Sequence, residues 1–530
     1  MSRNTEVFKT LPNDKDYQPL PPPPPDETTS GMVFACVYLL SVFSLASVVH
    51  TYHFSVAAKL AHAILVLMDT LRRLKVIFRA AVGPIEPEPD FEKFDETISP
   101  NMRALRLSMT IAEILTAMGV SVADIVSMAL DITDRYCKRK VQFDISSTLI
   151  TASQDRGNDR EPLTLVRHAK PRTPNSMTIQ SLQELVREIQ HGKLTLEAAE
   201  TKLEKIIDQP QKYPYWLTTI GGALISTGVG IMYGAGPLIL IIMFTLAAIV
   251  TYSMRVLVHR RVPTFFAQIF ASILITLIAA FVTLANRLDI VPWIHDVNAT
   301  LIVIGGIVML VAGLAIVSAV QDAIDEFYVT ANARLLKVIM LTIGIVAGVL
   351  IGLYVAKRLG VTIAVQSDLR PVQSNWQILG IAMISGGYAL NMQSRPFGII
   401  SAGLMGALAW LTYQAMLAPT PLGPAVASAT AAAVVGVCST LISRWWRTPS
   451  TTLMTAGIVP LVPGMLLFNG LLQLVGNAAN VTSFNDGVQT LFGAMLIALA
   501  IASGVSFGHL VARPIRRSFV RARNALPTRE

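Results

Sequence analysis

Long apolar runs separated by short polar segments make up most of the chain after residue 215. Ten such runs have approximate cores at 216–234, 237–254, 265–285, 299–320, 336–355, 376–392, 398–417, 424–442, 453–475 and 488–510. An α-helix needs about 20 apolar residues to cross the hydrocarbon core of a bilayer. The pattern therefore predicts an all-α polytopic membrane protein with about ten transmembrane helices.

Residues 99–212 have a different pattern, typical of a small water-exposed α+β domain. Apolar residues recur at helical spacing over 102–112 and over 122–129, on either side of Gly119. Val141, Phe143 and Ile145 then alternate with polar neighbours, which predicts a half-buried strand. Residues 153–174 are polar and predict a loop. Two further helices follow, and Thr195 is the expected N-cap of the second.

Residues 1–98 combine a proline-rich tail with apolar segments. Residues 1–30 contain the run Pro21–Pro25 and predict a disordered tail with a short polyproline piece. Residues 31–49 carry no charge and are long enough to span a bilayer, whereas 54–77 are apolar but interrupted by charges. The second segment fits an interfacial amphipathic helix or a poor second span. The pattern leaves open whether this region crosses the membrane, and residues 83–95 form a linker.

Composition agrees with a membrane protein and narrows the function. Hydrophobic residues make up 52% of the 530 residues, charged residues only 15%, and the formal net charge is +9. The basic residues cluster beside apolar runs, which indicates cytoplasmic loops and anionic lipid rather than nucleic acid. The three cysteines show neither a disulfide pattern nor metal-ligand spacing. The chain has no phosphate-binding loop, no HExxH and no GxSxG, so we expect neither an enzyme nor a cofactor.

The distribution of basic residues predicts which side of the membrane each loop occupies. Two sets of loops alternate along the ten runs, and the set on the side of the 99–212 domain carries eight basic residues against four on the other side. The basic tail, 513–530, falls on the first side. Because cytoplasmic loops are enriched in lysine and arginine, we expect the small domain and the C-terminus to be cytoplasmic.

The membrane part contains a short internal repeat. The segment from Gly306 to Gly313 and the segment from Gly457 to Gly464, 151 residues later, agree at six of eight positions. Trp216 and Trp376 open the two copies, which correspond to residues 213–356 and 357–512 with five helices each. Because five is odd, the two copies should have opposite orientations in the membrane, as in transporters built from inverted repeats. Chance similarity between apolar helices is the alternative explanation.

Each copy has an interruption at the same place in its fourth helix. The first is Ala312-Gly313 and the second is Pro463-Gly464. Proline and glycine free backbone hydrogen-bonding groups inside a membrane helix, and paired interruptions in two halves indicate a transporter's binding site. The other interpretation is that Gly313 and Gly464 only let helices pack closely.

Several segments of this sequence resemble the threonine/serine exporter family. They are Arg261–Gln268 (RVPTFFAQ), the block Val308–Gly348 around Gln321-Asp322, the PxxYPxW stretch Pro210–Trp216, and Ala456–Gly464 (AGIVPLVPG), and residues 105–153 resemble the family's N-terminal domain. The resemblance covers roughly residues 101–513. It implies a soluble domain followed by ten spans, and export of L-threonine and L-serine driven by the proton motive force. The apolar segment 31–49 departs from the family pattern.

An exporter of hydroxy amino acids needs partners for a carboxylate, an ammonium and a hydroxyl. Helix N-termini at broken spans suit the carboxylate, which gives Gly313, Pro463 and Gly464 a role. The side chains of Gln268, Gln321 and Asn469 are polar candidates in or near the spans. The expected partners are thus the substrate amino acid, protons and lipid, and a homo-oligomer is compatible with the sequence. A channel, a scaffold or an intramembrane enzyme with an unrecognised site is the alternative.

Asp322 is the ionisable candidate, because it directly follows the interrupted span. Three roles are open for its carboxylate: a proton site, a partner for the substrate ammonium, or an ion pair with Arg334. The alternative is that Asp322 is a solvated charge at a helix end and takes no part in transport.

Overall fold

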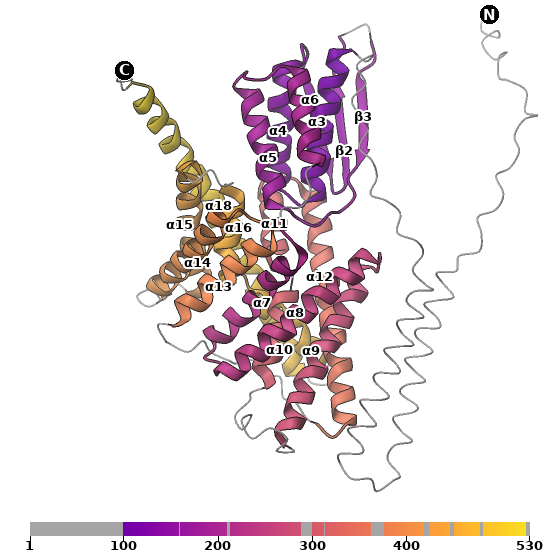
Figure 1. Ribbon diagram of the computed structural model, residues 1–530, viewed down its shortest axis with the longest axis vertical. Coiled ribbons are helices and arrows are strands. Elements are labelled where there is room, and N and C mark those ends of the chain that lie inside the picture. The colour runs from indigo at the N-terminus through magenta and orange to yellow at the C-terminus, as the bar shows by residue number, and fades with distance from the viewer. Residues whose placement is uncertain are drawn as a thin grey trace, which may run out of the picture. The chain divides into compact units, whose positions relative to one another are not determined.

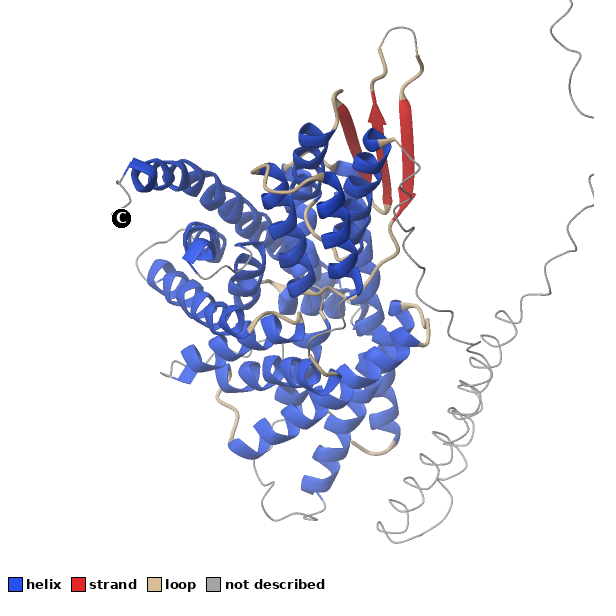
Figure 2. Ribbon diagram, turned by 45° about the horizontal axis from the view of Figure 1, so that its top comes forward, coloured by secondary structure: helices blue, strands red, loops and turns tan. Residues whose placement is uncertain are grey.

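The computed structural model describes residues 99–157, 160–208, 213–287, 299–311, 313–361, 376–417, 423–445, 450–476 and 481–525. The predictions for the tail, the apolar segments and the linker in 1–98 lie outside these residues. Within them the chain is mainly helical (Figure 1), and its strands form one small sheet (Figure 2).

The first described elements are four helices and three strands. In chain order they are α3 (Pro100–Ala117), α4 (Val122–Tyr136), β1 (Val141–Ser146), β2 (Leu149–Gln154), β3 (Leu163–His168), α5 (Ser176–Gln190) and α6 (Leu196–Asp208). The strands form an antiparallel sheet in the order β1-β2-β3, with Ile145 opposite Ile150 and Ile150 opposite Arg167. The loop predicted for 153–174 was therefore partly wrong. Apolar and polar residues do not alternate along β3, because Val166 is exposed and Arg167 is at an inner position.

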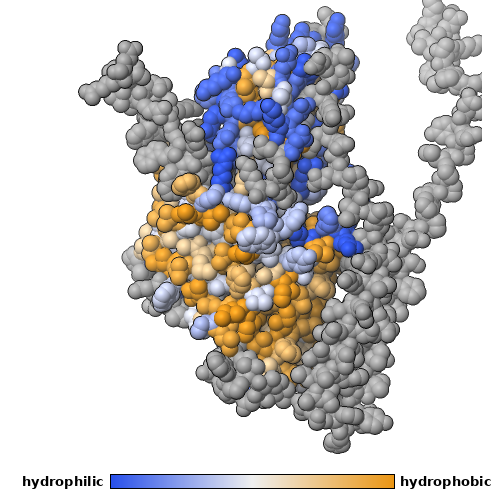
Figure 3. All heavy atoms as spheres, in the orientation of Figure 1, coloured by the Kyte–Doolittle hydropathy of each residue, from blue (hydrophilic) through white to orange (hydrophobic). Residues whose placement is uncertain are grey.

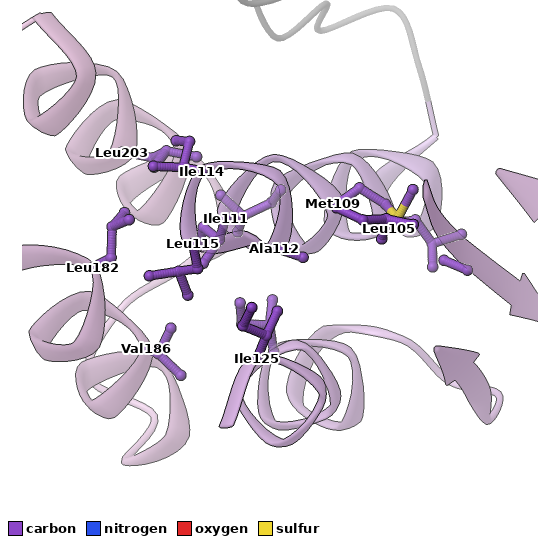
Figure 4. Packing of buried hydrophobic residues seen from close by; sticks show 14 of the residues in the cluster. Leu105, Met109, Ile111, Ala112, Ile114, Leu115, Ile125, Leu182, Val186 and Leu203 are labelled. Carbon is purple, nitrogen blue, oxygen red and sulfur yellow. The ribbon is translucent and has the colours of Figure 1, made fainter. Parts of the chain in front are cut away.

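These helices and strands share one apolar core. Leu105, Leu115, Leu182 and Leu203 come from three helices, and each is at most 1% exposed. Figure 4 shows Leu115 between Leu182, Leu203 and Ile125 of α4, with Leu105 farther along α3 beside Met109. Thr195 is placed as the predicted N-cap of α6, since the Ala198 amide lies 3.4 Å from its hydroxyl. This segment, α3–α6 with β1–β3, is called the α+β unit below.

The remaining helices are long and apolar, and together they form the helical bundle. They are α7 (Tyr215–Met232), α8 (Pro237–His259), α9 (Thr264–Arg287), α10 (Ala299–Leu310), α11 (Gly313–Ile324), α12 (Tyr328–Arg358), α13 (Trp376–Asn391), α14 (Pro396–Leu417), α15 (Gly423–Trp445), α16 (Ser450–Ile458), the 3₁₀ turn η2 (Val459–Leu461), α17 (Gly464–Gly476) and α18 (Val481–Ala525). Hydrophobic side chains dominate the face of this bundle seen in Figure 3, whereas the α+β unit is largely hydrophilic. The contrast is that expected of a membrane part and a water-exposed part.

Eight helices in the described residues are long and apolar enough to cross a membrane, and a bent pair makes a ninth. The chain is thus a multi-pass membrane protein by the length and composition of its helices. The predicted sixth span, 376–392, corresponds to α13, which has only 16 residues. The number ten stays a prediction. The last predicted span runs without interruption into the basic tail, because α18 is one helix of 45 residues.

Helix contacts in the two predicted copies correspond pair by pair. Helix α9 packs on α12 as α15 packs on α18, and α7 packs on α8 as α13 packs on α14. Across the copies, α12 contacts α17 and α18 contacts α11. All these contacts are preserved when α7–α12 is exchanged with α13–α18.

Candidate functional site: the meeting point of two broken helices

The first interruption falls between α10 and α11, which together make one candidate span of 26 residues, Ala299–Ile324. Helix α10 ends at Leu310, whose carbonyl is one of those left without an intrahelical donor at a helix C-terminus. The side-chain amide of Gln268 on α9 donates to it from Nε2 at 3.1 Å. The other amide atom, Gln268 Oε1, is buried and has no hydrogen-bond partner in the described part of the chain. The Gln268 amide nitrogen therefore bonds the carbonyl at the end of α10, and Gln268 Oε1 is left as a buried acceptor beside the break.

The second interruption bends the equivalent helix. Helix α16 ends in the turn η2, and α17 begins at Gly464, with a bend of 48° between the two segments. Two prolines lie in this stretch, Pro460 within the turn and Pro463 just before α17. Val462 has an extended backbone, φ −66° and ψ 130°, as expected of a residue before proline. Proline thus explains where the helix stops.

The two breaks lie against each other. A Cβ placed on Gly464 would lie 3.2 Å from Cγ1 of Val311, the residue that follows α10. Val308, just before the first break, and Val459 and Met465, on either side of the second, pack on one buried cluster. That cluster consists of Ile225, Val229, Ile304 and Ile384, from α7, α10 and α13. Two segments that are 151 residues apart in sequence therefore meet at one place.

Two tyrosines pack on the same cluster and were not predicted from the sequence. Tyr233 is the C-cap of α7, and Tyr388 lies on α13. A tyrosine within an apolar run carries little sequence signal, because the phenol ring is also a common core residue. Only the packing brings these two side chains to the breaks.

Asp322 points to the α+β unit. Its carboxylate is fully buried, with Oδ2 lying 2.8 Å from Nη1 of Arg334. Oδ1 accepts a hydrogen bond of 3.2 Å from the amide of Val122, the first residue of α4. Nη2 of Arg334 donates to the carbonyl of Val120 at 2.8 Å. The pair therefore caps the N-terminus of α4, and a helix N-terminus stabilises a negative charge such as the Asp322 carboxylate. Of the three roles considered for Asp322, these contacts match the ion pair with Arg334.

A second set of hydrogen bonds joins the α+β unit to the helical bundle. Thr330 Oγ1 accepts from the Ser147 amide at 2.9 Å and donates to the Ile145 carbonyl at 3.0 Å. On the α13–α14 turn, the Met392 carbonyl accepts from the Ser176 amide at 2.8 Å. Nδ2 of Asn175 donates to Oε1 of Gln393 at 2.9 Å. The α+β unit thus contacts one turn from each copy.

The other predicted site residues occupy separate positions. Gln321 is partly buried beside Asp322, and Asn469 is 8% exposed on α17. Gly313 begins α11 and Pro463 immediately precedes α17. The breaks therefore gather Gln268, Gly313, Pro463 and Gly464, whereas Gln321 and Asp322 lie at the far end of α11. No group of three or more metal-ligating side chains occurs among the described residues.

Comparison with known proteins confirms the resemblance. The family model "Putative threonine/serine exporter" matches residues 106–356, and "Threonine/Serine exporter, ThrE" matches 377–511. A relative from Mycobacterium tuberculosis, "Probable threonine/serine exporter", is 30% identical over 78% of this chain and 77% of its own length. The "Threonine/serine exporter" of Corynebacterium glutamicum is 29% identical over 78% of this chain and 83% of its own length.

No solved structure matches the chain. The two family models meet between α12 and α13, at the boundary between the predicted copies. The family is one of exporters and not of enzymes. The chain belongs to the threonine/serine exporter family.

Proposed function

We propose that this protein exports L-threonine and L-serine from the cytoplasm, driven by the proton motive force. The observation that carries the proposal is the contact between the two broken helices at Val311 and Gly464. Broken helices expose N-terminal amides and C-terminal carbonyls, which can bind the carboxylate and the ammonium of an amino acid. The names of the relatives support the choice of substrate.

The residues proposed to bind substrate are those at the breaks. The amides in the first turns of α11 and α17, which begin at Gly313 and Gly464, suit the carboxylate, although the Gly464 amide itself donates to the Val462 carbonyl at 2.8 Å. Pro463 fixes where α17 starts. The unpartnered Oε1 of Gln268 suits the ammonium. Gln321 is assigned a lesser role, because it lies beside Asp322 near the end of α11. Asn469, in the second turn of α17, stays a candidate. For Asp322 we propose a structural role at the α+β unit.

We propose further that the two copies form an inverted repeat. Gly221 of α7 meets Gly387 of α13, and Gly228 meets Gly380, so the helices run antiparallel. A twofold axis that exchanges antiparallel neighbours is perpendicular to both, and for membrane-spanning helices it lies in the membrane plane. The substrate site would then lie between two halves that rock against each other.

The contacts of the α+β unit support ten spans. This unit contacts Thr330, at the start of α12, and the α13–α14 turn, so both places lie on its side of the membrane. Helix α12 must then lead away from that side, and α13 must return to it. Although α13 has 16 residues, this connectivity supports a crossing helix. It also supports a shared side for the α+β unit and the C-terminus, proposed to be cytoplasmic.

Transport by the purified chain in proteoliposomes tests the proposal. We expect labelled L-threonine to move faster when a proton gradient is imposed, and the stimulation to vanish when a protonophore collapses it. A channel would carry threonine down its own gradient with no response to the protonophore. Chemical conversion of the threonine would indicate an enzyme. Either outcome would contradict the proposal.

A further inference from the structure

Tyr388 lies where the two copies and both broken helices meet. Its ring packs on the cluster of Ile225, Val229, Ile304 and Ile384, on which Val308, Val459 and Met465 also pack. The same ring contacts a second small cluster formed by Ala389, Ala402 and Ala456. Tyr388 therefore lies on α13 between one cluster that joins α7, α10 and α13 and a second that joins α13, α14 and α16.

The hydroxyl of Tyr388 has no hydrogen-bond partner among the described residues. Tyrosine hydroxyls in apolar surroundings normally have one, because an unpaired hydroxyl has lost its hydrogen bonds to water. The side chain is only partly buried. An unpaired phenol on the cluster that the residues flanking both breaks also contact is suited to a ligand that carries its own polar group.

We infer that Tyr388 is a specificity-determining residue whose hydroxyl hydrogen-bonds the side-chain hydroxyl of the transported amino acid. This inference rests on the proposed function. In the proposed function, the helix ends and Gln268 bind the carboxylate and the ammonium of the substrate. All amino acids carry these two groups, so they do not distinguish one amino acid from another. A site that hydrogen-bonds a hydroxyl rejects the isostere that lacks it far more strongly than an apolar pocket does, because the polar group of the site would then stay unpaired.

The test compares L-threonine with L-valine, which has a methyl group in place of the hydroxyl. Initial transport rates of both are measured in proteoliposomes of the full chain and of Tyr388→Phe, which lacks only the phenolic oxygen. Wild-type protein should prefer threonine, and the threonine-to-valine ratio should fall at least about tenfold in the variant. The matched control is Tyr252→Phe on α8, whose side chain is 61% exposed. Its ratio should equal that of the wild type.

Because the ratio is internal to each sample, it does not depend on how much of the variant is folded. An unchanged ratio in Tyr388→Phe overturns the inference, and so does a wild type that carries valine as fast as threonine. A wild type that carries neither above protein-free liposomes contradicts the proposed function itself. As a second readout, L-threonine should raise the Tm of the wild type in detergent and should raise that of Tyr388→Phe less. An equal rise in both would also overturn the inference.

Discussion

Gly221 and Gly387 contact each other reciprocally across the α7–α13 crossing. A Cβ on Gly221 would lie 2.8 Å from the carbonyl oxygen of Gly387, and a Cβ on Gly387 would lie 2.8 Å from that of Gly221. The same reciprocity joins Gly228 and Gly380. Real Cβ atoms do not approach other atoms so closely, so only glycine lets these two backbones touch. At this crossing the two copies therefore meet backbone to backbone.

We predict that Gly387→Val separates α7 from α13 and destabilises the fold. Overpacking a close contact costs about 1–3 kcal/mol, and here the obstacle is backbone that cannot turn aside. The measurement is the Tm and the yield of monodisperse protein in detergent. The control is Gly493→Val on α18, where a Cβ would meet nothing within 4 Å. Equal stability of the two variants would show that α7 and α13 do not touch in this way.

Asp322→Asn should destabilise the contact between α11 and the α+β unit. The substitution removes the charge that Arg334 faces at 2.8 Å, and breaking a buried ion pair by changing one partner costs about 3–5 kcal/mol. We expect low protein abundance and faster proteolysis at the α3–α4 turn. The double variant Asp322→Asn/Arg334→Gln should recover part of the lost abundance, because no unpaired charge then remains.

The same variants separate the three roles of Asp322. A proton site would give a stable Asp322→Asn protein that exchanges labelled threonine but no longer responds to the proton gradient. An ammonium site would give a stable protein that does neither. Normal abundance of the single variant with either transport defect would contradict the structural role.

Pro463→Ala and Gly464→Leu should impair transport more than membrane insertion. Alanine would remove the proline that fixes where α17 starts, and leucine at 464 would press on Val311, which a Cβ alone approaches to 3.2 Å. Export rate and protein level are measured on the same cells, with Gly493→Leu as the control for adding a leucine to a helix. Normal export at normal abundance by Gly464→Leu would remove the second break from the site.

Cys137 should react slowly with maleimides in the folded protein. Burial, with a smaller contribution from Asp134, raises the pKa of its thiol to about 11. Since the thiolate is the nucleophile, labelling at pH 8 should be on the order of a hundredfold slower than for an unfolded cysteine of pKa ~8.5. The raised pKa favours the neutral thiol in the folded state, so this contribution to stability is complete below pH ~8.5 and is lost as the pH rises toward 11. Labelling rates are measured in a Cys36→Ser/Cys438→Ala background, and fast labelling at pH 8 would contradict the burial.

Reporter fusions test the side of the membrane on which both ends of the bundle lie. One reporter is inserted within 153–174, in the segment between β2 and α5, and the other after Arg523. We expect both to give a cytoplasmic signal, because an even number of spans separates them. A periplasmic signal from either fusion would exclude the ten-span topology.

The sequence by itself determined the class of the protein and the location of both helix breaks. Apolar length depends only on composition along the chain, so ten apolar runs were visible before any packing was known, and eight described helices are long and apolar enough to span. The breaks at Gly313 and at Pro463-Gly464 are equally local, because proline and glycine act on their own helix. The family followed from residue identity alone.

Contacts between distant segments were decided only by the tertiary structure. Asp322 has the same sequence signature whether its carboxylate binds a proton, a substrate or Val122, which lies 200 residues away. β3 was missed because its residue types do not alternate: Arg167 faces inward, where it bonds to Thr110 and Glu113, and Val166 is exposed. Tyr388 reads as an ordinary core aromatic until packing places it beside both breaks. Side-chain roles of this kind depend on which groups meet in space, and the local pattern along a membrane helix, where nearly every residue is apolar, carries almost no information about that.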